Sequence, residues 1–355
     1  MMRLPNRYNL WIKAVLALLL VWWCIGLAPI QVRGRLVSEA MAASALDGVI
    51  EGAKKEGKVV IYESQSLAAW SKIMGAFQKR YPFVKEWNQE QLTAADVPTR
   101  IVNESRAGAP TADLFGNSPP TSIPLIQRGL VVEVAWKTLG VPEKTIYDRY
   151  TVLGNMFAYV IGYNTQMISS RDVPKTWEGL LDPKWKGKGG WWRAASPWNA
   201  LAAEWGISKT EEYLKKFLAN DFRPSRTTAD VATWVAAGEV PLAVTVLHRL
   251  QQAQEKGAPV AWVFAEPVPI LPLAYGVIKG AKNANTAKLL IHWLTTQEGA
   301  NVYEKQTHRG NPFVEGTEFA KLMGRLKTAD FPADKHEEYV KATKAIEDLL
   351  KREGR

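Results

Sequence analysis

The sequence predicts an α/β protein of two lobes, each a mostly parallel sheet flanked by helices, with a hinge of two crossing strands. Two observations indicate this fold. Short β-branched strands alternate with amphipathic helices along the chain, which is typical of right-handed βαβ units. The alternation comes in two sets, one before and one after about residue 157. A length of 355 residues suits two domains of common size.

The first set of elements begins near residue 45. We expect helices at 45–55, 68–81 and 97–107, and strands at 58–62, 83–87 and 112–115. Gly57 ends the first helix, because glycine takes the left-handed conformation of a helix C-terminus without strain. Pro82 ends the second, because proline cannot continue a helix.

The second set begins near Phe157. We expect strands at 157–163, 241–246 and 260–264, a turn-rich connector at 182–188, and helices at 197–205, 209–219, 228–237 and 247–256. Segment 265–272 contains three prolines, which cannot donate to a sheet ladder, so we expect an extended crossing there rather than a sheet interior. A strand at 273–279, a helix at 285–294 and a charged helical tail from Glu318, ending in 335–351, complete the chain.

These elements predict how the chain is divided. Lobe 1 is expected to comprise 46–157 plus 268–315, and lobe 2 to comprise 158–267, with a C-terminal helical segment at 316–355. The cleft between two such lobes collects strand ends and helix N-termini. Their free N–H groups and the positive end of each helix dipole suit an anion.

Residues 1–42 are expected to be a secretory signal peptide. Basic residues (Arg3, Arg7, Lys13) precede the apolar run 14–28, and small residues at Ala40-Met-Ala-Ala43 follow, with cleavage expected after Ala42 or Ala43. The alternative is an uncleaved membrane anchor, because the apolar run approaches the length of a membrane span. Either outcome places the rest of the chain outside the cytoplasm, and we expect a periplasmic protein.

Charge and cysteine content exclude several classes of protein. The net charge is +10, but residues 1–42 carry five basic residues and one acid, so about +6 remains after cleavage. That charge is scattered, without the basic run of a nucleic-acid binder, so no nucleic-acid partner is expected. It supports at most a mild preference for anionic solutes. Cys24 is the single cysteine, so no intramolecular disulfide can form.

Several short segments, in order along residues 50–310, carry a resemblance to a known family. They are Lys55–Tyr62, Ala76–Pro82, Ala107–Asp113, Val160–Thr165, Val173–Trp177, Leu180–Lys188, Ala236–Leu242, Lys256–Val260 and Ala287–Leu294. Together they resemble the extracellular solute-binding proteins of bacterial ABC importers, in the iron-type (ferric-binding-like) branch of the type II periplasmic-binding fold.

The resemblance implies a receptor rather than an enzyme. It implies a protein, expected to be a monomer without a cofactor, that captures a small solute between its lobes and delivers it to an ABC importer permease in the inner membrane. It also implies that loops after particular strands line the cleft. In lobe 1 those loops contain Ser64, Gln65 and Ser66, and then Asn117 and Ser118. These residues can contact the ligand, or only cap helices and form turns.

In lobe 2 the implied contacts cluster around one segment. They are Trp191, Trp192, Arg193, Ser196, Trp198 and Asn199, together with Tyr159 on the first crossing. Arg193 can bind a carboxylate or phosphate through two hydrogen bonds. Adjacent strand residues face opposite sides, so at most one of Trp191 and Trp192 reaches the cleft. Tyr159 can contact the solute or only pack the hinge.

The segment around His248 bears on the identity of the cargo. Ferric-iron members of the family carry adjacent tyrosines here and often a histidine in the first loop, whereas this chain has Val246, Leu247 and Ser66. His248 is a further candidate ligand contact, but an imidazole without phenolates is a poor ferric site. We therefore favour an organic anion, with no metal site, and keep a ferric-iron or iron-chelate carrier as the alternative.

A periplasmic enzyme or the ligand-binding subunit of a sensor on the same fold is the alternative from another class. The four histidines are dispersed, and no metal-site spacing, nucleophile elbow or phosphate-binding glycine loop occurs. Since no nucleophile–base pair is visible, we expect no catalytic residues.

Overall fold

The computed structural model describes residues 30–109, 111–330 and 335–353. The apolar run and Cys24 of the expected signal peptide lie outside these residues. The helices are α2 (Ile30–Glu56), α3 (Leu67–Arg80), α4 (Asp96–Arg106), α5 (Pro119–Gln127), α6 (Ser196–Trp205), α7 (Ile207–Ala219), α8 (Thr228–Ala237), α9 (Leu247–Glu255), α10 (Ala284–Leu294), α11 (Gln297–Thr307), α12 (Glu318–Met323) and α13 (His336–Arg352). No helix in the described ranges has the length and apolarity needed to cross a membrane.

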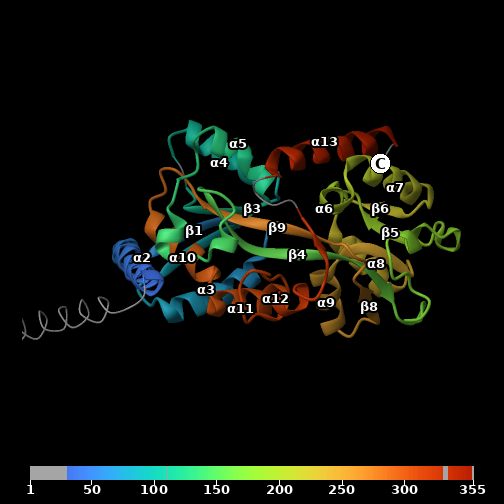
Figure 1. Cartoon of the computed structure of the whole chain (residues 1–355), viewed down its shortest axis with the longest axis horizontal. Coiled ribbons are helices and arrows are strands. Elements are labelled where there is room, and N and C mark those ends of the chain that lie inside the picture. The colour runs from blue at the N-terminus through green and yellow to red at the C-terminus, as the bar shows by residue number, and fades with distance from the viewer. Residues whose placement is uncertain (1–29, 110, 331–334, 354–355) are drawn as a thin grey trace, which may run out of the picture.

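The strands form one continuous path in the order β2-β1-β3-β9-β4-β7-β5-β6, with β10 beside β9 and β8 beside β4. They are β1 (Lys58–Glu63), β2 (Glu86–Gln91), β3 (Leu114–Asn117), β4 (Thr151–Asn164), β5 (Gly189–Trp192), β6 (Arg223–Ser225), β7 (Leu242–Val246), β8 (Val260–Val263), β9 (Val268–Val277) and β10 (Thr328–Ala329). Figure 1 shows helices flanking this sheet at both ends of the molecule. The predicted two-lobed α/β fold is confirmed.

Each lobe has its own parallel strands. In lobe 1, β1 pairs in parallel with β2 and β3, and α2–α5, α10 and α11 accompany them. In lobe 2, β5 pairs in parallel with β6 and β7, and α6–α9 accompany them. Separate apolar cores follow from this division: one forms around Trp70, Phe77 and Trp293, the other around Trp177, Trp198 and Phe217.

The long strands β4 and β9 join the lobes as an antiparallel pair (Figure 1). The start of β4 pairs with β9, and its end pairs with β7 and β8 of lobe 2. β9 pairs at its far end with β3 of lobe 1. All fourteen residues of β4 are buried, which is typical of a strand covered on both faces.

The proline-rich segment corrects one expectation. We expected an extended crossing outside the sheet, but β9 begins at Val268, and Ile270 and Pro272 pair with Ala158 and Met156 of β4. On the other side of β9, β10 pairs only at residues 268–269 and β3 only at residues 274–277. No strand pairs with Pro272 on that side of β9. The sheet therefore tolerates a residue that has no N–H to donate there.

The C-terminal helix α13 belongs structurally to lobe 2. Its residues Ile346, Leu349 and Leu350 enter the lobe 2 core. The hydroxyl of Thr343 also accepts a hydrogen bond of 2.6 Å from the Asn199 side chain of α6. α13 thus supports α6 from the side opposite the lobe 2 sheet (Figure 1).

Gly154 offers a test of the hinge packing. It lies at a register shift in β4, and a Cβ there would collide with the ring of Tyr275 on β9. Gly154→Ala is expected to lower the free energy of unfolding by about 1–3 kcal/mol, since an added methyl group forces a packed ring to move. Urea unfolding followed by circular dichroism measures this change.

Gly75→Ala is the matched control. A Cβ at Gly75 in α3 meets nothing within 4 Å, so the same added methyl is expected to stabilise the protein by about 0.5–1 kcal/mol. Equal stability of the Gly154→Ala variant and the wild type would contradict the close packing of Tyr275 on β4.

Candidate ligand-binding site

The helices that follow β1, β3, β5 and β7 begin next to the hinge strands. Ser66 caps α3, and its Oγ accepts a 3.3 Å hydrogen bond from the Ala69 amide. In lobe 2, α9 begins directly after β7, and α6 begins at Ser196, whose hydroxyl lies 2.9 Å from the Tyr159 hydroxyl of β4. A small pocket between the starts of α5 and α6 is lined by residues of both lobes, among them Pro119 and Ser196.

A buried polar cluster lies beside Phe157 of the hinge strand β4. It consists of Glu63 at the end of β1, His248 in α9, and Arg309 in the loop after α11, which are 0%, 2% and 8% exposed. Arg309 Nη2 lies 3.3 Å from His248 Nε2 and so joins a lobe 1 loop to a lobe 2 helix. The carboxylate of Glu63 accepts a hydrogen bond of 2.6 Å from the indole of Trp70. We call these three residues the interlobe cluster.

The interlobe cluster is incompletely hydrogen-bonded. Glu63 Oε1, His248 Nδ1, and Nε and Nη1 of Arg309 are buried and have no partner among the described residues. Buried polar atoms in folded proteins are normally paired, because an unpaired group has lost its hydrogen bonds to water. Four such atoms within one cluster make it a candidate binding site.

Burial and charge set the protonation of the interlobe cluster. Burial raises the pKa of the Glu63 carboxyl, and the charge of Arg309 opposes this rise. Burial also lowers the pKa of His248 well below its usual value of 6.5, and the charges of Arg309 and Arg249 lower it further. His248 is therefore neutral at physiological pH, which leaves the guanidinium groups as the positive charges of the site.

Aromatic side chains form an apolar wall beside the interlobe cluster. Phe157, Tyr159, Val246 and Leu273 pack together, with the half-buried Trp192 against them. The Trp192 and Tyr159 rings stack at 6.1 Å with an interplanar angle of 14°. We call these five residues the interlobe wall.

Phe157 joins the interlobe wall to the interlobe cluster. Its ring lies 5.3 Å from that of His248 and 5.0 Å from the Arg309 guanidinium carbon. The guanidinium of Arg309 is therefore held against an aromatic face, an arrangement that fixes its orientation.

The structure places the expected lobe 1 residues in different surroundings. Gln65, two residues after Glu63, is buried, and its Oε1 accepts a hydrogen bond from the Ser66 amide. Ser64 is exposed. The buried Asn117 bonds the Ala94 carbonyl and the Ser118 amide, and the Ser118 hydroxyl contacts Thr121. Ser64, Gln65 and Ser66 directly follow Glu63 of the interlobe cluster on the chain.

The expected lobe 2 residues separate into two groups. Tyr159, Trp192, Ser196 and His248 lie at the interlobe wall or cluster. The exposed Arg193 has no side-chain bond to a described residue.

The side chains of Trp191, Trp198 and Asn199 point elsewhere. Trp191 donates to the Phe222 carbonyl inside the lobe 2 core, and Trp198 packs on Phe217 at 4.8 Å. Asn199 is held by Thr343 of α13. Because these contacts are internal to lobe 2, none of the three side chains is brought to the interlobe wall.

Five residues of the interlobe cluster and wall were not expected as contacts from the sequence: Glu63, Arg309, Phe157, Val246 and Leu273. Glu63 could have been recognised from the sequence as a carboxylate at the end of a largely apolar strand, directly before Ser64. Arg309 lies in a loop after α11 with no motif around it, so its place opposite α9 comes from the tertiary fold alone.

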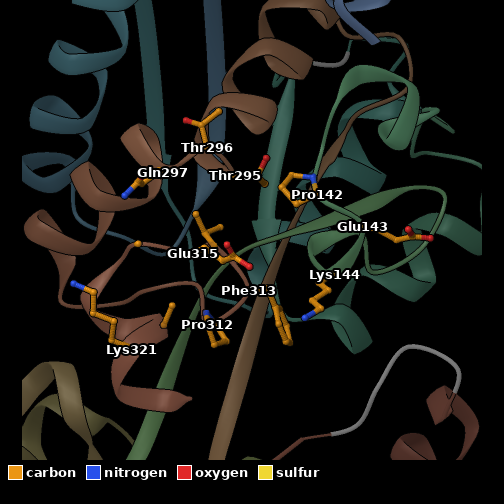
Figure 2. A pocket seen from close by; sticks show the side chains of 13 residues that line it. Pro142, Glu143, Lys144, Thr295, Thr296, Gln297, Pro312, Phe313, Glu315 and Lys321 are labelled. Carbon is orange, nitrogen blue, oxygen red and sulfur yellow. The ribbon is translucent and has the colours of Figure 1, made fainter. Parts of the chain in front are cut away.

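A larger cavity lies elsewhere, in lobe 1. It has a volume of about 920 Å³ and is lined by the 142–144 segment, the turn between α10 and α11, and the 312–316 loop. Figure 2 shows Thr295, Gln297 and Phe313 around it. None of the interlobe residues lines this cavity. Throughout the ranges that the structure describes, no group of three or more His, Cys, Asp or Glu side chains is placed to hold a metal ion.

Comparisons with known proteins agree with this architecture. The family model for the bacterial extracellular solute-binding protein matches residues 72–317. An uncharacterized protein of Haemophilus influenzae is 26% identical over 297 residues, covering 76% of this chain and 82% of the relative.

Solved structures show the same fold at low sequence identity. Iron-bound HitA of Pseudomonas aeruginosa has a TM-score of 0.69 at 20% identity, covering 82% of this chain and 99% of that one. AfuA of Actinobacillus pleuropneumoniae, with fructose-6-phosphate bound, has a TM-score of 0.62 at 20% identity, covering 83% and 97%. The family model covers well over half of the chain. The chain therefore belongs to the family of bacterial extracellular solute-binding proteins.

Proposed function

We propose that this protein captures an organic anion between its lobes and delivers it to the permease of an ABC importer. The observation that carries the proposal is Arg309, a guanidinium that is 8% exposed and has two nitrogens without partners. A guanidinium presents a planar fork that matches a carboxylate or phosphate, which makes arginine suited to binding such groups.

The charges around Arg309 support an anionic ligand. Arg249, the residue after His248, is partly buried, and its Nε has no partner within the described chain. Arg249 and Arg309 oppose a single buried carboxylate, that of Glu63, so the site carries a net positive charge. An anion lowers the electrostatic cost of holding two guanidinium groups near each other in a poorly solvated place.

The same charges disfavour the iron alternative. Val246 and Leu247 occupy the position where phenolates are expected in ferric carriers, and both side chains are buried and apolar. The adjacent His248 faces Arg309, whose charge repels a trivalent cation. Among structures of the same fold, HitA is iron-bound and AfuA holds fructose-6-phosphate, so the fold accommodates both kinds of cargo.

The hinge supports a closing mechanism. Arg309 extends from the lobe 1 side and His248 from lobe 2, and both lie against Phe157 of β4. A ligand that contacts residues of both lobes stabilises the closed form by its greater affinity for that form. The closed form then docks to the permease. We further propose that residues 1–42 direct export, that the lobes comprise 46–157 plus 268–315 and 158–267, and that the monomer works in the periplasm.

A ligand screen tests the nature of the cargo. The mature protein is expected to show a raised melting temperature with one or more carboxylates, phosphates or sulfonates, since binding to the folded state stabilises it by mass action. Differential scanning fluorimetry with these anions, polyamines and ferric citrate measures the shift, and small-angle scattering with the best anion is expected to show compaction. A shift with ferric ion and with no iron-free anion would refute the proposal.

Arg309→Gln tests the residue itself. Removing a buried charge partner typically costs about 2–5 kcal/mol, so the Kd for the best anion of the screen is expected to rise roughly 30-fold or more. Calorimetric titration measures it. Arg106→Gln, which removes one exposed positive charge from α4, is the control and should bind as the wild type does. Unchanged affinity in a folded Arg309→Gln variant would contradict the role of this residue.

Glu63→Gln tests the buried carboxylate through its pH dependence. The pKa of Glu63 in the folded protein lies above its ordinary value of 4.5, so folding favours its protonated form. The stability gained from that form is present below pH 4.5 and is lost as the pH rises. The free energy of unfolding of Glu63→Gln, relative to the wild type, is therefore expected to increase from pH 4 to pH 7 in urea titrations. The exposed Glu315→Gln is the control variant, and a flat difference for Glu63→Gln would contradict a Glu63 carboxyl whose pKa is raised by burial.

A further inference from the structure

The loop after α11 reaches α9 of lobe 2 at two points. His308 Nε2 lies 3.0 Å from Glu255 Oε2. The next residue, Arg309, places its Nη2 3.3 Å from His248 Nε2. His248 and Glu255 are seven residues apart, which is about two helical turns, so both lie on one face of α9. Two consecutive residues from the lobe 1 side therefore hold the first and the last turn of one lobe 2 helix.

The same loop is fixed to the hinge strand β4. Gly310 exchanges two backbone hydrogen bonds with Met156, of 2.6 and 3.2 Å. The side chain of Asn311, which is 1% exposed, donates a hydrogen bond of 2.7 Å to the Leu153 carbonyl. The two contacts with α9 are thus made from a backbone that cannot leave β4 without losing these bonds.

His308 has a backbone conformation that histidine rarely adopts. It is the C-cap of α11, with a φ of 56° and a ψ of 19°, in the left-handed region where helix C-termini usually have glycine. Glycine would relieve this strain, so the stability of α11 alone does not explain a histidine here. The bond to Glu255 gives the side chain a role that glycine cannot supply.

The surroundings of His308 leave polar contacts to join the two helices. Its side chain is 19% exposed, so water has only limited access to compete for the bond with Glu255. A cavity of about 290 Å³ lies beside His308 and is lined by residues of α9, α11 and α12, among them Leu247 and Phe319. Close packing is therefore interrupted between α9 and the end of α11.

We infer that His308 and Glu255 form an interlobe latch, which holds α9 against the loop of Arg309 and stabilises the closed form. The bond exists only while the lobes are together, so it favours closing and adds nothing to the folding of either lobe alone. His308 is a positioning residue, because it acts through α9 and Arg309. The effect of the latch on solute release rests on the proposed function, whereas its effect on the lobes does not.

Distances between the lobes test the latch without any solute. The mature protein has no cysteine, because Cys24 lies in the expected signal peptide, so spin labels can be attached at Lys72→Cys in α3 and Lys215→Cys in α7. Both positions are exposed. Electron–electron double resonance is expected to show a larger share of long distances in His308→Gly and in Glu255→Ala than in the labelled protein with the latch intact.

Dissociation kinetics test the effect on solute release. The tightest-binding carboxylate, phosphate or sulfonate of the screen is expected to leave each variant roughly 3- to 10-fold faster, as for the loss of one hydrogen bond, with the association rate changed by less than about 2-fold. The double variant is expected to match either single variant, because both remove the same bond. A weakened fold would not explain this result, since His308→Gly relieves backbone strain and is expected to keep or raise the melting temperature.

Glu86→Ala is the matched control. It breaks an exposed ion pair of 3.3 Å with Lys58 that lies inside lobe 1, and it is expected to leave the distances and the rates unchanged. Unchanged distances in both His308→Gly and Glu255→Ala overturn the latch, and unchanged dissociation rates overturn its part in solute retention. Additive effects in the double variant also overturn it, because the two side chains then act separately. Failure of every anion to bind refutes the organic-anion proposal instead, and the distances still decide the latch.

Discussion

The antiparallel pairing of β4 with β9 is the constraint on which the rest of the structure depends. The two strands form the middle of a single sheet path, with the parallel strands of lobe 1 on one side and those of lobe 2 on the other. Each lobe is a complete α/β unit with its own core, yet the backbone between them is continuous. Every helix that begins near the hinge is positioned relative to this pair, and so is the loop that carries Arg309.

The sequence predicted the elements that local pattern determines. Helix 228–237 was expected at its observed bounds, and the strand at 260–264 was one residue too long. The expected strand at 83–87 lies instead at Glu86–Gln91, a polar edge strand without the alternation that marks a half-buried one. The prolines of β9 led to the wrong prediction that segment 265–272 lies outside the sheet. Whether a strand tolerates proline depends on which strands pair with it, and the local sequence does not show this pairing.

The site was less predictable than the fold. The alternation of a strand separated Trp191 from Trp192, which face the lobe 2 core and Tyr159 respectively, while the loops after strands remain predicted ligand contacts. Arg309 could not be found in this way, since it is about 60 residues from His248 and its loop carries no signal. Polar residues in loops are common, and only burial without a partner separates a binding group from an ordinary turn.

The path of the C-terminal segment has a mechanical consequence. After α11 in lobe 1, the chain passes through β10, which lies beside β9, and then forms α13 on the lobe 2 core. The lobes are thus tethered by three covalent crossings instead of two. A third connection, anchored on α6 through Asn199 and Thr343, is expected to resist twisting of one lobe against the other more than two adjacent strands do. We therefore expect the relative motion of the lobes to be mainly opening and closing about one axis.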